Sequence, residues 1–384
     1  MSFMIMYMYS NNFMMLMAFS FFYLLNKESM INMMMIFMTF MMMKMIFFSM
    51  KEKMNNFFFF MKKKMIMVLL VALMLFFFTK KVMHFYIFFE IVSLMIFSLI
   101  FFSSFSNQRL KASIYMFMFM TMSTFPMLVM FFFINEKTMM LIFLMGFSIK
   151  LPIMFFHLWL PKAHVEANFY DSMILASLLL KLGGYGIMVL SMNKKMNFLM
   201  MWSLVSILFL SLNMIFLMDL KMIFAYSSII HMNGMILMVL SNNFSTEMMF
   251  MIMMISHAIS SSLMFYIIGL MYEFSFSRMM MMNKNFLTNN YIFFMMIFLT
   301  MFINMAMPPM MTFFSEMYVY MAVMNYSMKM LLFLVFTMFA TMMFNLMVLK
   351  NLGMSNMNKF FKMNQLSVKN LILMKEHMTF LIFM

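Results

Sequence analysis

Apolar runs of about 20 residues alternate with short polar connections along almost the whole chain. A helix needs about 20 apolar residues to cross the hydrocarbon core of a bilayer. The pattern therefore predicts an all-α polytopic membrane protein with thirteen or fourteen spanning helices. The expected segments lie near 3–25, 30–50, 65–79, 82–104, 112–135, 138–158, 169–191, 196–218, 220–241, 247–271, 286–306, 308–327, 329–350 and 370–384.

The connections between these runs are short, so residues 1–384 are expected to form a single transmembrane helical domain. The longest polar stretch, 350–370, is expected to hold a surface loop or an interfacial helix. The first run, Ser2 to Leu25, lacks a basic start and a small-residue cleavage site, so it is interpreted as a spanning helix and not as a signal peptide.

Composition excludes a soluble globular class. The chain is 66% hydrophobic and 10% charged, whereas soluble domains are about half apolar and about a quarter charged. Met (79) and Phe (58) dominate the apolar runs. A membrane does not demand these two residues over Leu, Ile or Val, so the bias indicates a small AT-rich organellar genome.

The chain contains no cysteine. A disulfide, a thiolate metal site and iron–sulfur ligation within it are therefore excluded, and no redox centre is expected in this chain. The net charge is +15, but the basic residues cluster between apolar runs, as at Lys62–Lys64. We expect them to contact anionic lipid headgroups and not nucleic acid.

Several ionisable residues interrupt runs that are long enough to span a bilayer. Glu90, Lys181, His257 and Glu316 lie inside such runs, and Lys221 stands at the head of another. A charge at bilayer depth costs several kcal/mol, so it usually faces a protein-lined cavity and serves ion or proton movement. These residues predict an ion or proton carrier. Glu90 and Lys181, of opposite charge, are expected to form a pair.

The stretch 149–189 concentrates rare residues, including Gly183, Gly184 and Gly186 directly after Lys181. Small residues permit close helix contact and weaken the helix, and a broken helix at membrane depth is tolerated where it lines a cavity. The double proline 308–309, just before Glu316, predicts a second interrupted helix.

Other interpretations of these residues stay open from sequence alone. Lys221 fits an interfacial lysine at a helix start equally well, and His257, in a run of serines, fits either a hydrated proton path or a structural histidine. His157, His164 and Glu166 could form a metal site. A polar connection at the membrane interface is preferred, because Pro161 is expected to end a helix between the two histidines.

Five blocks of the sequence together resemble the chain 4 family of NADH:ubiquinone oxidoreductase, an antiporter-like membrane subunit of respiratory complex I. The blocks are HFYIFFE, KLPIMFFHLWLPKAHVEA with LLLKLGGYG, DLKMIFAYSSIIHM, SHAISSSLMFYIIGLMYE and NMAMPPMMTFFSEM. HLWLPKAHVEA combined with KLGGYG favours chain 4 over the related subunits 2 and 5. The chain departs from the family pattern at Asn168, Asp171 and Ser315.

The resemblance implies about fourteen helices, with two inverted repeats that contain broken helices, and an antiporter-like core over about 82–350. It implies proton translocation through Glu90, Lys181, Lys221, His257 and Glu316, with Lys221 as the central lysine, coupled to quinone reduction elsewhere. NADH, FMN, iron–sulfur clusters and ubiquinone would belong to partner subunits. Antiporter-like subunits 2 and 5 and lipids such as cardiolipin are the implied neighbours, in the mitochondrial inner membrane.

Three rival functions remain. A cation/proton antiporter subunit would use the same helices, and a structural arm would space other subunits without pumping. A haem-binding oxidase subunit would need facing histidine pairs, whereas the six histidines are scattered through the chain.

Overall fold

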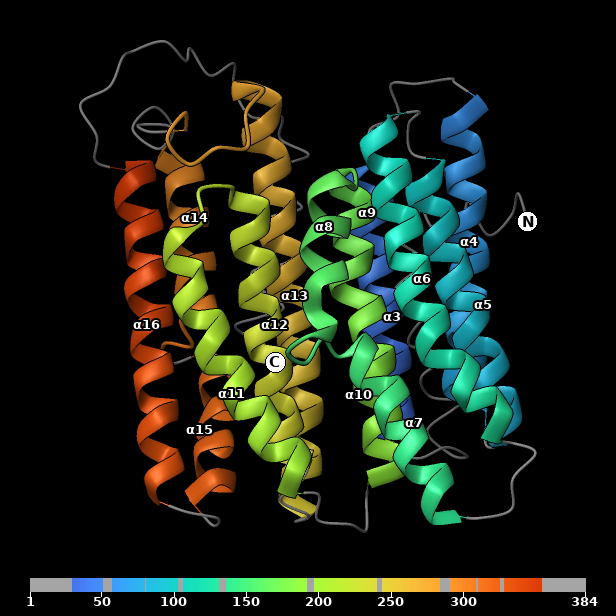
Figure 1. The fold of residues 1–384 in the computed structure, drawn as a ribbon. Helices are drawn as coiled ribbons and strands as arrows, with labels where there is room; N and C mark the ends of the chain where they lie inside the picture. The colour runs from blue at the N-terminus through green and yellow to red at the C-terminus, as the bar shows by residue number, and fades with distance from the viewer. Residues whose placement is uncertain are drawn as a thin grey trace. The chain divides into compact units, whose positions relative to one another are not determined.

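The computed structural model describes residues 30–50, 57–79, 81–102, 106–130, 136–191, 197–239, 244–283, 291–308, 310–324 and 328–353 (Figure 1). Within these ranges the chain is helical, with one isolated β-bridge between Asp219 and Met279. The all-α membrane fold is therefore confirmed. The expected helices at 3–25 and 370–384 and the polar stretch 350–370 lie outside the described residues, apart from the first residues of that stretch.

The chain divides into two compact units, with the boundary after Phe117. The described helices that lie wholly in the first unit are α3 (Met30–Ser49), α4 (Phe57–Phe78) and α5 (Val82–Phe101). They pack in chain order, α3 on α4 and α4 on α5. Between α4 and α5, Phe76 contacts Phe85, with ring centroids 4.4 Å apart.

The second unit holds the rest of the described chain, and α6 (Asn107–Met130) enters it at Met118. Its further helices are α7 (Glu136–Lys150), α8 (Trp159–Glu166), α9 (Phe169–Ile174), α10 (Leu180–Ser191), α11 (Asn197–Asn213), α12 (Leu220–Val239), α13 (Phe244–Ser275), α14 (Tyr291–Asn304), α15 (Met311–Met324) and α16 (Met328–Gly353). Helices α11, α12, α15 and α16 lie within a few residues of the predicted runs, because the length of an apolar run limits where a spanning helix can end. The predicted run 138–158 was too long, since α7 ends at Lys150, and α8 was not predicted.

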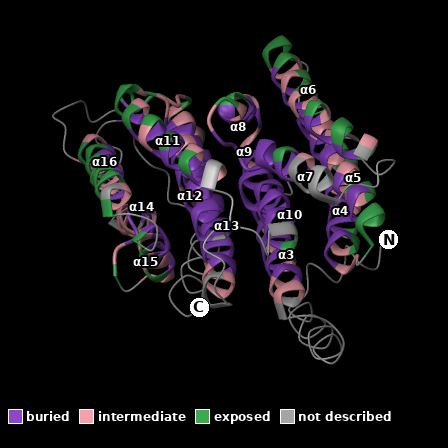
Figure 2. Cartoon of the chain, turned by 60° about the horizontal axis from the view of Figure 1, so that its bottom comes forward, coloured by how far each residue is buried: buried purple, intermediate pink, exposed green. Residues whose placement is uncertain are grey.

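Helix α13 forms the centre of the second unit. It contacts α9, α10, α12, α14 and α15, and 94% of its apolar stretch is buried, against 33% in α16 (Figure 2). A helix with buried residues on every face needs no lipid contact, so α13 can carry polar side chains that a peripheral helix cannot.

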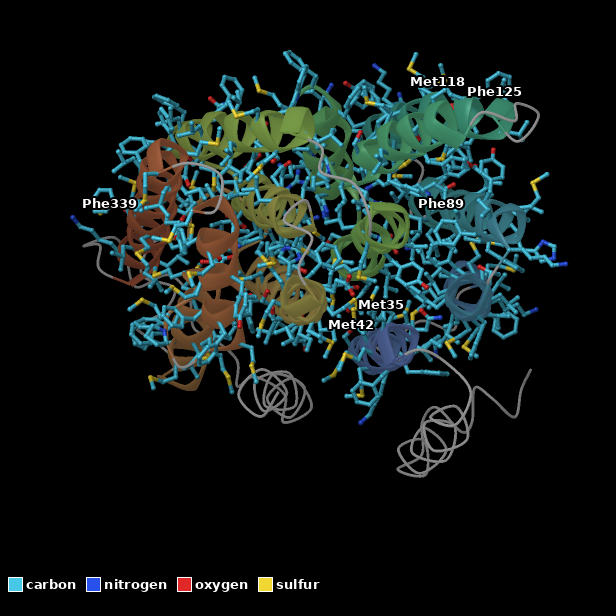
Figure 3. The ribbon with its side chains drawn as sticks, turned by 90° about the horizontal axis from the view of Figure 1, so that it is seen from below. Met35, Met42, Phe89, Met118, Phe125 and Phe339 are labelled. Atoms are coloured by element: carbon cyan, nitrogen blue, oxygen red, sulfur yellow. The ribbon has the colours of Figure 1, made fainter. Side chains whose placement is uncertain are left out.

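The outward faces of the peripheral helices are apolar. On α6, Met118 and Phe125 are 53% and 69% exposed, and on α16 Phe339 is 61% exposed (Figure 3). Soluble proteins rarely expose so many large apolar side chains together. Seven helices among the described residues are long and apolar enough to cross a membrane, so these faces fit contact with lipid chains.

Two helices of the second unit are interrupted. Helix α7 ends at Lys150, and the chain passes through Phe155, at a φ of 73°, before α8 begins at Trp159. Two hydrogen bonds secure this break. Trp159 Nε1 donates to the Ile149 carbonyl at 3.1 Å, and Asn233 Nδ2, on α12, donates to the Pro152 carbonyl at 3.2 Å.

The second interruption separates α14 from α15, with Ala306 at a φ of 49°. Thr312 Oγ1 donates to the Ile303 carbonyl at 3.1 Å, which ties the start of α15 to the end of α14. The interrupted helix predicted before Glu316 is thus present. Pro161 does not end a helix as expected. It lies in the first turn of α8, where a missing N–H loses no helical bond.

The glycine cluster does not break its helix. Residues 169–191 run continuously from α9 through a π-helical turn, Leu175–Leu179, into α10. The irregular turn therefore precedes Lys181, and the glycines that follow allow close packing. A Cβ on Gly183 would lie 3.0 Å from Lys150 Cβ, and one on Gly186 would lie 2.6 Å from the Phe147 ring.

Gly186→Ala is therefore expected to destabilise the contact between α7 and α10 by roughly 1–3 kcal/mol, because the added Cβ would force the buried Phe147 ring to shift. Gly234→Ala is the matched control, since its Cβ would have no neighbour closer than 3.6 Å. The midpoint of thermal unfolding of the purified assembly measures both. Equal midpoints for the two variants would contradict the packing argument.

Candidate functional site

Lys181 is fully buried, and two partners hold its ammonium group. Nζ lies 2.7 Å from the Ala176 carbonyl and 2.8 Å from His257 Nδ1, on α13. A π-helical turn leaves carbonyls without their usual partner four residues on, and Ala176 lies in such a turn. The irregular backbone before Lys181 thus supplies an acceptor for its side chain.

His257 and His231 bring α13 and α12 together next to this lysine. Their ring centroids are 5.8 Å apart. His257 is surrounded by the serine run predicted from sequence, and Ser256 and Ser260 donate their hydroxyl protons to backbone carbonyls one turn earlier. Because those protons are already used, the serine oxygens face other groups as acceptors.

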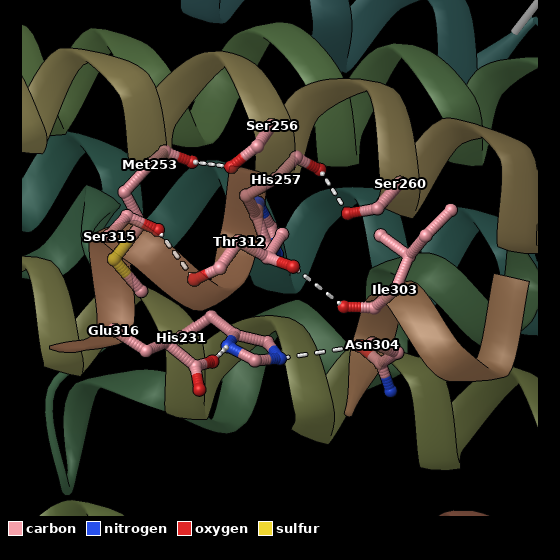
Figure 4. A pocket seen from close by; sticks show the side chains of 10 residues that line it. All are labelled: His231, Met253, Ser256, His257, Ser260, Ile303, Asn304, Thr312, Ser315 and Glu316. Carbon is pink, nitrogen blue, oxygen red and sulfur yellow. Dashed lines mark hydrogen bonds and ion pairs between the residues drawn. The ribbon is translucent and has the colours of Figure 1, made fainter. Parts of the chain in front are cut away.

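His231 connects to the carboxylate of Glu316. His231 Nδ1 lies 3.0 Å from Glu316 Oε1, and His231 Nε2 lies 3.3 Å from the side-chain oxygen of Asn304, the last residue of α14 (Figure 4). Glu316 and His231 are both mostly buried, with side-chain exposures of 8% and 15%. A buried carboxylate needs such a partner, because an unpaired charge at this depth is costly.

A small cavity adjoins both histidines and Glu316. Hydroxyl, amide and carboxylate groups supply its polar lining. The lining residues are His231, Met253, Ser256, His257, Ser260, Ile303, Asn304, Thr312, Ser315 and Glu316. No direct hydrogen bond joins the two rings, and a polar cavity of this size has room for about one water molecule beside them.

Lys221 lies apart from this series of contacts. Its Nζ donates to the Ala167 carbonyl at 2.6 Å and approaches the Val165 carbonyl at 3.4 Å, and it lies over the Phe169 ring. These carbonyls belong to the C-terminal end of α8, where a cation is favourable. His164, buried and stacked on Phe265, is within electrostatic range of both Lys221 and Lys181.

Glu90 lies on α5 of the first unit and is partly buried. Its Oε1 atom has no hydrogen-bond partner among the described residues. Lys181 belongs to the second unit, so the Glu90–Lys181 pair stays a prediction. The structure does bring together Lys181, His257 and Glu316, three of the five predicted residues.

Two polar residues inside the second unit, His231 and Lys150, were not among the candidates. His231 lies between His257 and Glu316 and completes the series of contacts. It was missed although its sequence block, AYSSIIHM, had been singled out. Lys150 is fully buried at the end of α7, beside Gly183 of α10. Its signal was a lysine at the end of an apolar run directly before Leu151 and Pro152, which is easily taken for a boundary residue.

His157, His164 and Glu166 do not form a metal site. No group of three His, Asp or Glu side chains that could hold a metal ion occurs in the described part of the chain. His157 lies in a 3₁₀ turn, and α8, which carries His164, begins two residues after it.

Comparison with known proteins places this arrangement in a family. The sequence model of the "NADH:quinone oxidoreductase/Mrp antiporter, TM" family matches residues 134–343, more than half of the chain. The chain belongs to this family. The match includes both interrupted helices and every residue from Lys150 to Glu316 discussed above.

Among curated proteins, the antiporter-family chain is similar to relatives named NADH-ubiquinone oxidoreductase chain 4. That of Artemia franciscana is 32% identical over 253 residues, which is 61% of this chain and 65% of the relative. That of Locusta migratoria is 30% identical over 288 residues, 68% of this chain and 64% of the relative. The matched region thus spans just under two thirds of the length of these relatives.

Solved structures show the same antiporter-family fold. A chain of respiratory complex I from Thermus thermophilus with bound NADH superposes with a TM-score of 0.79 at 15% identity, covering 92% of this chain and 79% of that chain. A chain of the archaeal membrane-bound sulfane sulfur reductase gives 0.78 at 14% identity, covering 92% and 78%. The fold therefore occurs in more than one respiratory membrane complex.

Proposed function

We propose that the chain is a proton-translocating subunit of the membrane arm of NADH:ubiquinone oxidoreductase. The observation that carries the proposal is the buried series Lys181, His257, His231 and Glu316, which joins α10, α12, α13 and α15 through contacts of 2.8 Å and 3.0 Å and one shared polar cavity. Titratable groups placed this way inside a membrane protein are typical of proton relays.

Each step of the relay moves one proton between neighbouring groups. The Lys181 ammonium donates a proton to the His257 Nδ1 lone pair, and His257 releases a proton into the cavity. His231 donates its Nδ1 proton to the Glu316 carboxylate, and the Nδ1 lone pair left behind accepts the proton from the cavity. After each transfer, the change in charge on the donor favours return of the proton until the donor is protonated again. Charged groups near the relay can therefore set the direction of proton transfer.

Glu90 and Lys221 are the proposed controls of this relay. Glu90 would act on Lys181 as its predicted partner, and a shift of charge there would change the readiness of Lys181 to release a proton. Lys221 would act through His164, which responds to the charges of both lysines. Lys221 is also proposed to carry a proton itself, as the family resemblance implies.

At the level of the complex, the proposal assigns electron transfer to other subunits. The relatives are named for NADH and ubiquinone chemistry, and this chain has no cysteine for an iron–sulfur cluster. We infer that NADH, FMN, iron–sulfur clusters and ubiquinone bind partner subunits. Antiporter-like subunits 2 and 5 and cardiolipin are the proposed neighbours, in the mitochondrial inner membrane.

A native gel of solubilised mitochondrial membranes, stained for NADH dehydrogenase activity, tests this assignment. Mass spectrometry of the active band is expected to find peptides of this chain. Their presence only in a smaller, inactive assembly would overturn the assignment to the oxidoreductase.

A cation/proton antiporter subunit is the second candidate function. It is favoured by the family itself, which includes Mrp antiporters, and by the similar fold in a sulfane sulfur reductase complex. Sodium-dependent proton movement in vesicles without NADH oxidation would support it. Proton movement that requires NADH and ubiquinone and ignores sodium would support the oxidoreductase.

Replacing Lys221 separates its two possible roles. Lys221→Gln and Lys221→Arg are both expected to abolish proton pumping if Lys221 must release a proton, because arginine keeps its charge at any physiological pH. If Lys221 only caps the α8 carbonyls, Lys221→Arg will pump like the unchanged protein, because arginine can donate to the same carbonyls. The ratio of protons moved to NADH oxidised, measured in sealed membrane vesicles, distinguishes the two results.

A further inference from the structure

Two asparagines, Asn345 buried and Asn304 partly buried, form a chain of hydrogen bonds that ends on His231. Asn304 closes α14, and Asn345 lies on α16 with 1% of its surface exposed. Asn304 Nδ2 donates to Asn345 Oδ1 at 3.1 Å. The amide nitrogen of Asn304 is thereby used, and its oxygen lies 3.3 Å from His231 Nε2.

This orientation gives His231 an acceptor at both ring nitrogens. Glu316 Oε1 faces Nδ1 and the Asn304 oxygen faces Nε2. A neutral imidazole has one N–H, so it satisfies one of these acceptors and leaves the other facing a lone pair. The imidazolium donates to both, which makes it the form that the surroundings fit.

We propose that the Asn304–Asn345 amide pair is a positioning device that holds His231 in its doubly protonated form and sets the pH range of the relay. The inference rests on the proposed proton-translocating function and deepens it. Neither asparagine carries a proton in the relay. Each acts by fixing which atom of Asn304 meets the histidine.

Other charged groups around His231 set the background for this effect. Helix α15 supplies Glu316, with Tyr320 in the adjoining apolar cavity. Helix α13 supplies His257, which bonds to Lys181 of α10. His164 of α8 stacks on Phe265 instead, and α11 has no titratable side chain. The carboxylate of Glu316 is the strongest of these influences, so the amide pair is expected to tune the relay and not to create it.

Two substitutions at Asn345 move the relay in opposite directions. Asn345→Leu removes the acceptor that orients Asn304, so the imidazolium is held less well. Asn345→Asp keeps an acceptor there and adds negative charge, so the imidazolium is held better. Asn345 does not belong to the relay, and leucine and aspartate both have the branched shape of asparagine.

The test is the pH profile of NADH-driven proton pumping by the intact complex in sealed vesicles. Asn345→Leu is expected to shift the alkaline limb to lower pH by roughly one unit, since a hydrogen bond to a charged group has about that effect. Asn345→Asp is expected to shift the limb to higher pH. A merely structural role would lower the amount of assembled complex and leave the limb in place.

Each variant decides the matter alone, so failed assembly of one leaves the other as the test. A limb at the unchanged position in an assembled variant overturns the amide proposal. Loss of pumping in Glu316→Gln together with an unmoved limb would overturn this inference and leave the proposed function standing. Normal pumping in Glu316→Gln would overturn the proposed function itself.

Discussion

Glu316→Gln is expected to reduce proton pumping per NADH oxidised by at least about tenfold, with the complex still assembled. Glutamine has nearly the same shape as glutamate, so it can occupy the cavity lined by Thr312 and Ser315. It cannot accept a proton from His231, whose Nδ1 lies 3.0 Å from the carboxylate. Loss of a positioned proton acceptor typically costs more than a tenfold change in rate.

The measurement is the ratio of protons moved to NADH oxidised in sealed membrane vesicles, with the amount of complex read from a native gel. Glu247→Gln is the matched control, because Glu247 lies in the first turn of α13, away from the cavity. An unchanged ratio in Glu316→Gln would show that Glu316 is not the last proton acceptor of the relay and would contradict the proposed mechanism.

The helices were predictable because their causes are local. The length of an apolar run decides where a spanning helix can begin and end, so α12 and α16 lie within a few residues of the predicted segments. The interruption before Glu316 was likewise predictable from a double proline. The interruption after Lys150 was not predicted although Pro152 stands in it, and one of the hydrogen bonds that secure it comes from Asn233, 81 residues away from Pro152.

Predicting the site succeeded where a single residue was out of place in its surroundings. Lys181, His257 and Glu316 each stand in an apolar run, and the cost of burying them indicated function without any knowledge of their partners. The partners themselves were not predictable. His231 bonds to Glu316 across 85 positions of the chain, and Lys181 bonds to His257 across 76. Such contacts follow from helix packing, which no local pattern records.

The position of the irregular backbone near Lys181 was also not predictable from the sequence. Three glycines after Lys181 favoured a broken helix there, yet α10 continues through them. Their small size serves close packing against Lys150, Met254 and Phe147. The backbone irregularity is the π turn before Lys181, where the ordinary residues Leu175–Leu179 carry no sequence signal. Composition indicated that this segment was special, and packing decided how.

Lys181→Met is expected to have a comparably large effect, with a loss of proton pumping of at least about tenfold. Methionine can fill most of the buried volume of the lysine side chain, but it cannot donate to the Ala176 carbonyl or exchange a proton with His257. Lys350→Met, at the exposed end of α16, is the matched control. Pumping at the unchanged rate in Lys181→Met would place the start of the relay elsewhere.

The same variant tests the predicted Glu90–Lys181 pair. If the two residues act together, adding Glu90→Gln to Lys181→Met will cause little further loss, because the interaction is already gone. If Glu90 acts through another buried cation of the second unit, such as Lys150, the loss of pumping in the double variant will be the sum of the losses in the two single variants. Rates of NADH-driven quinone reduction and proton pumping in the two single variants and the double variant give the coupling directly. Additive losses would contradict the pair and leave the contact between Lys181 and His257 as the first step of the relay.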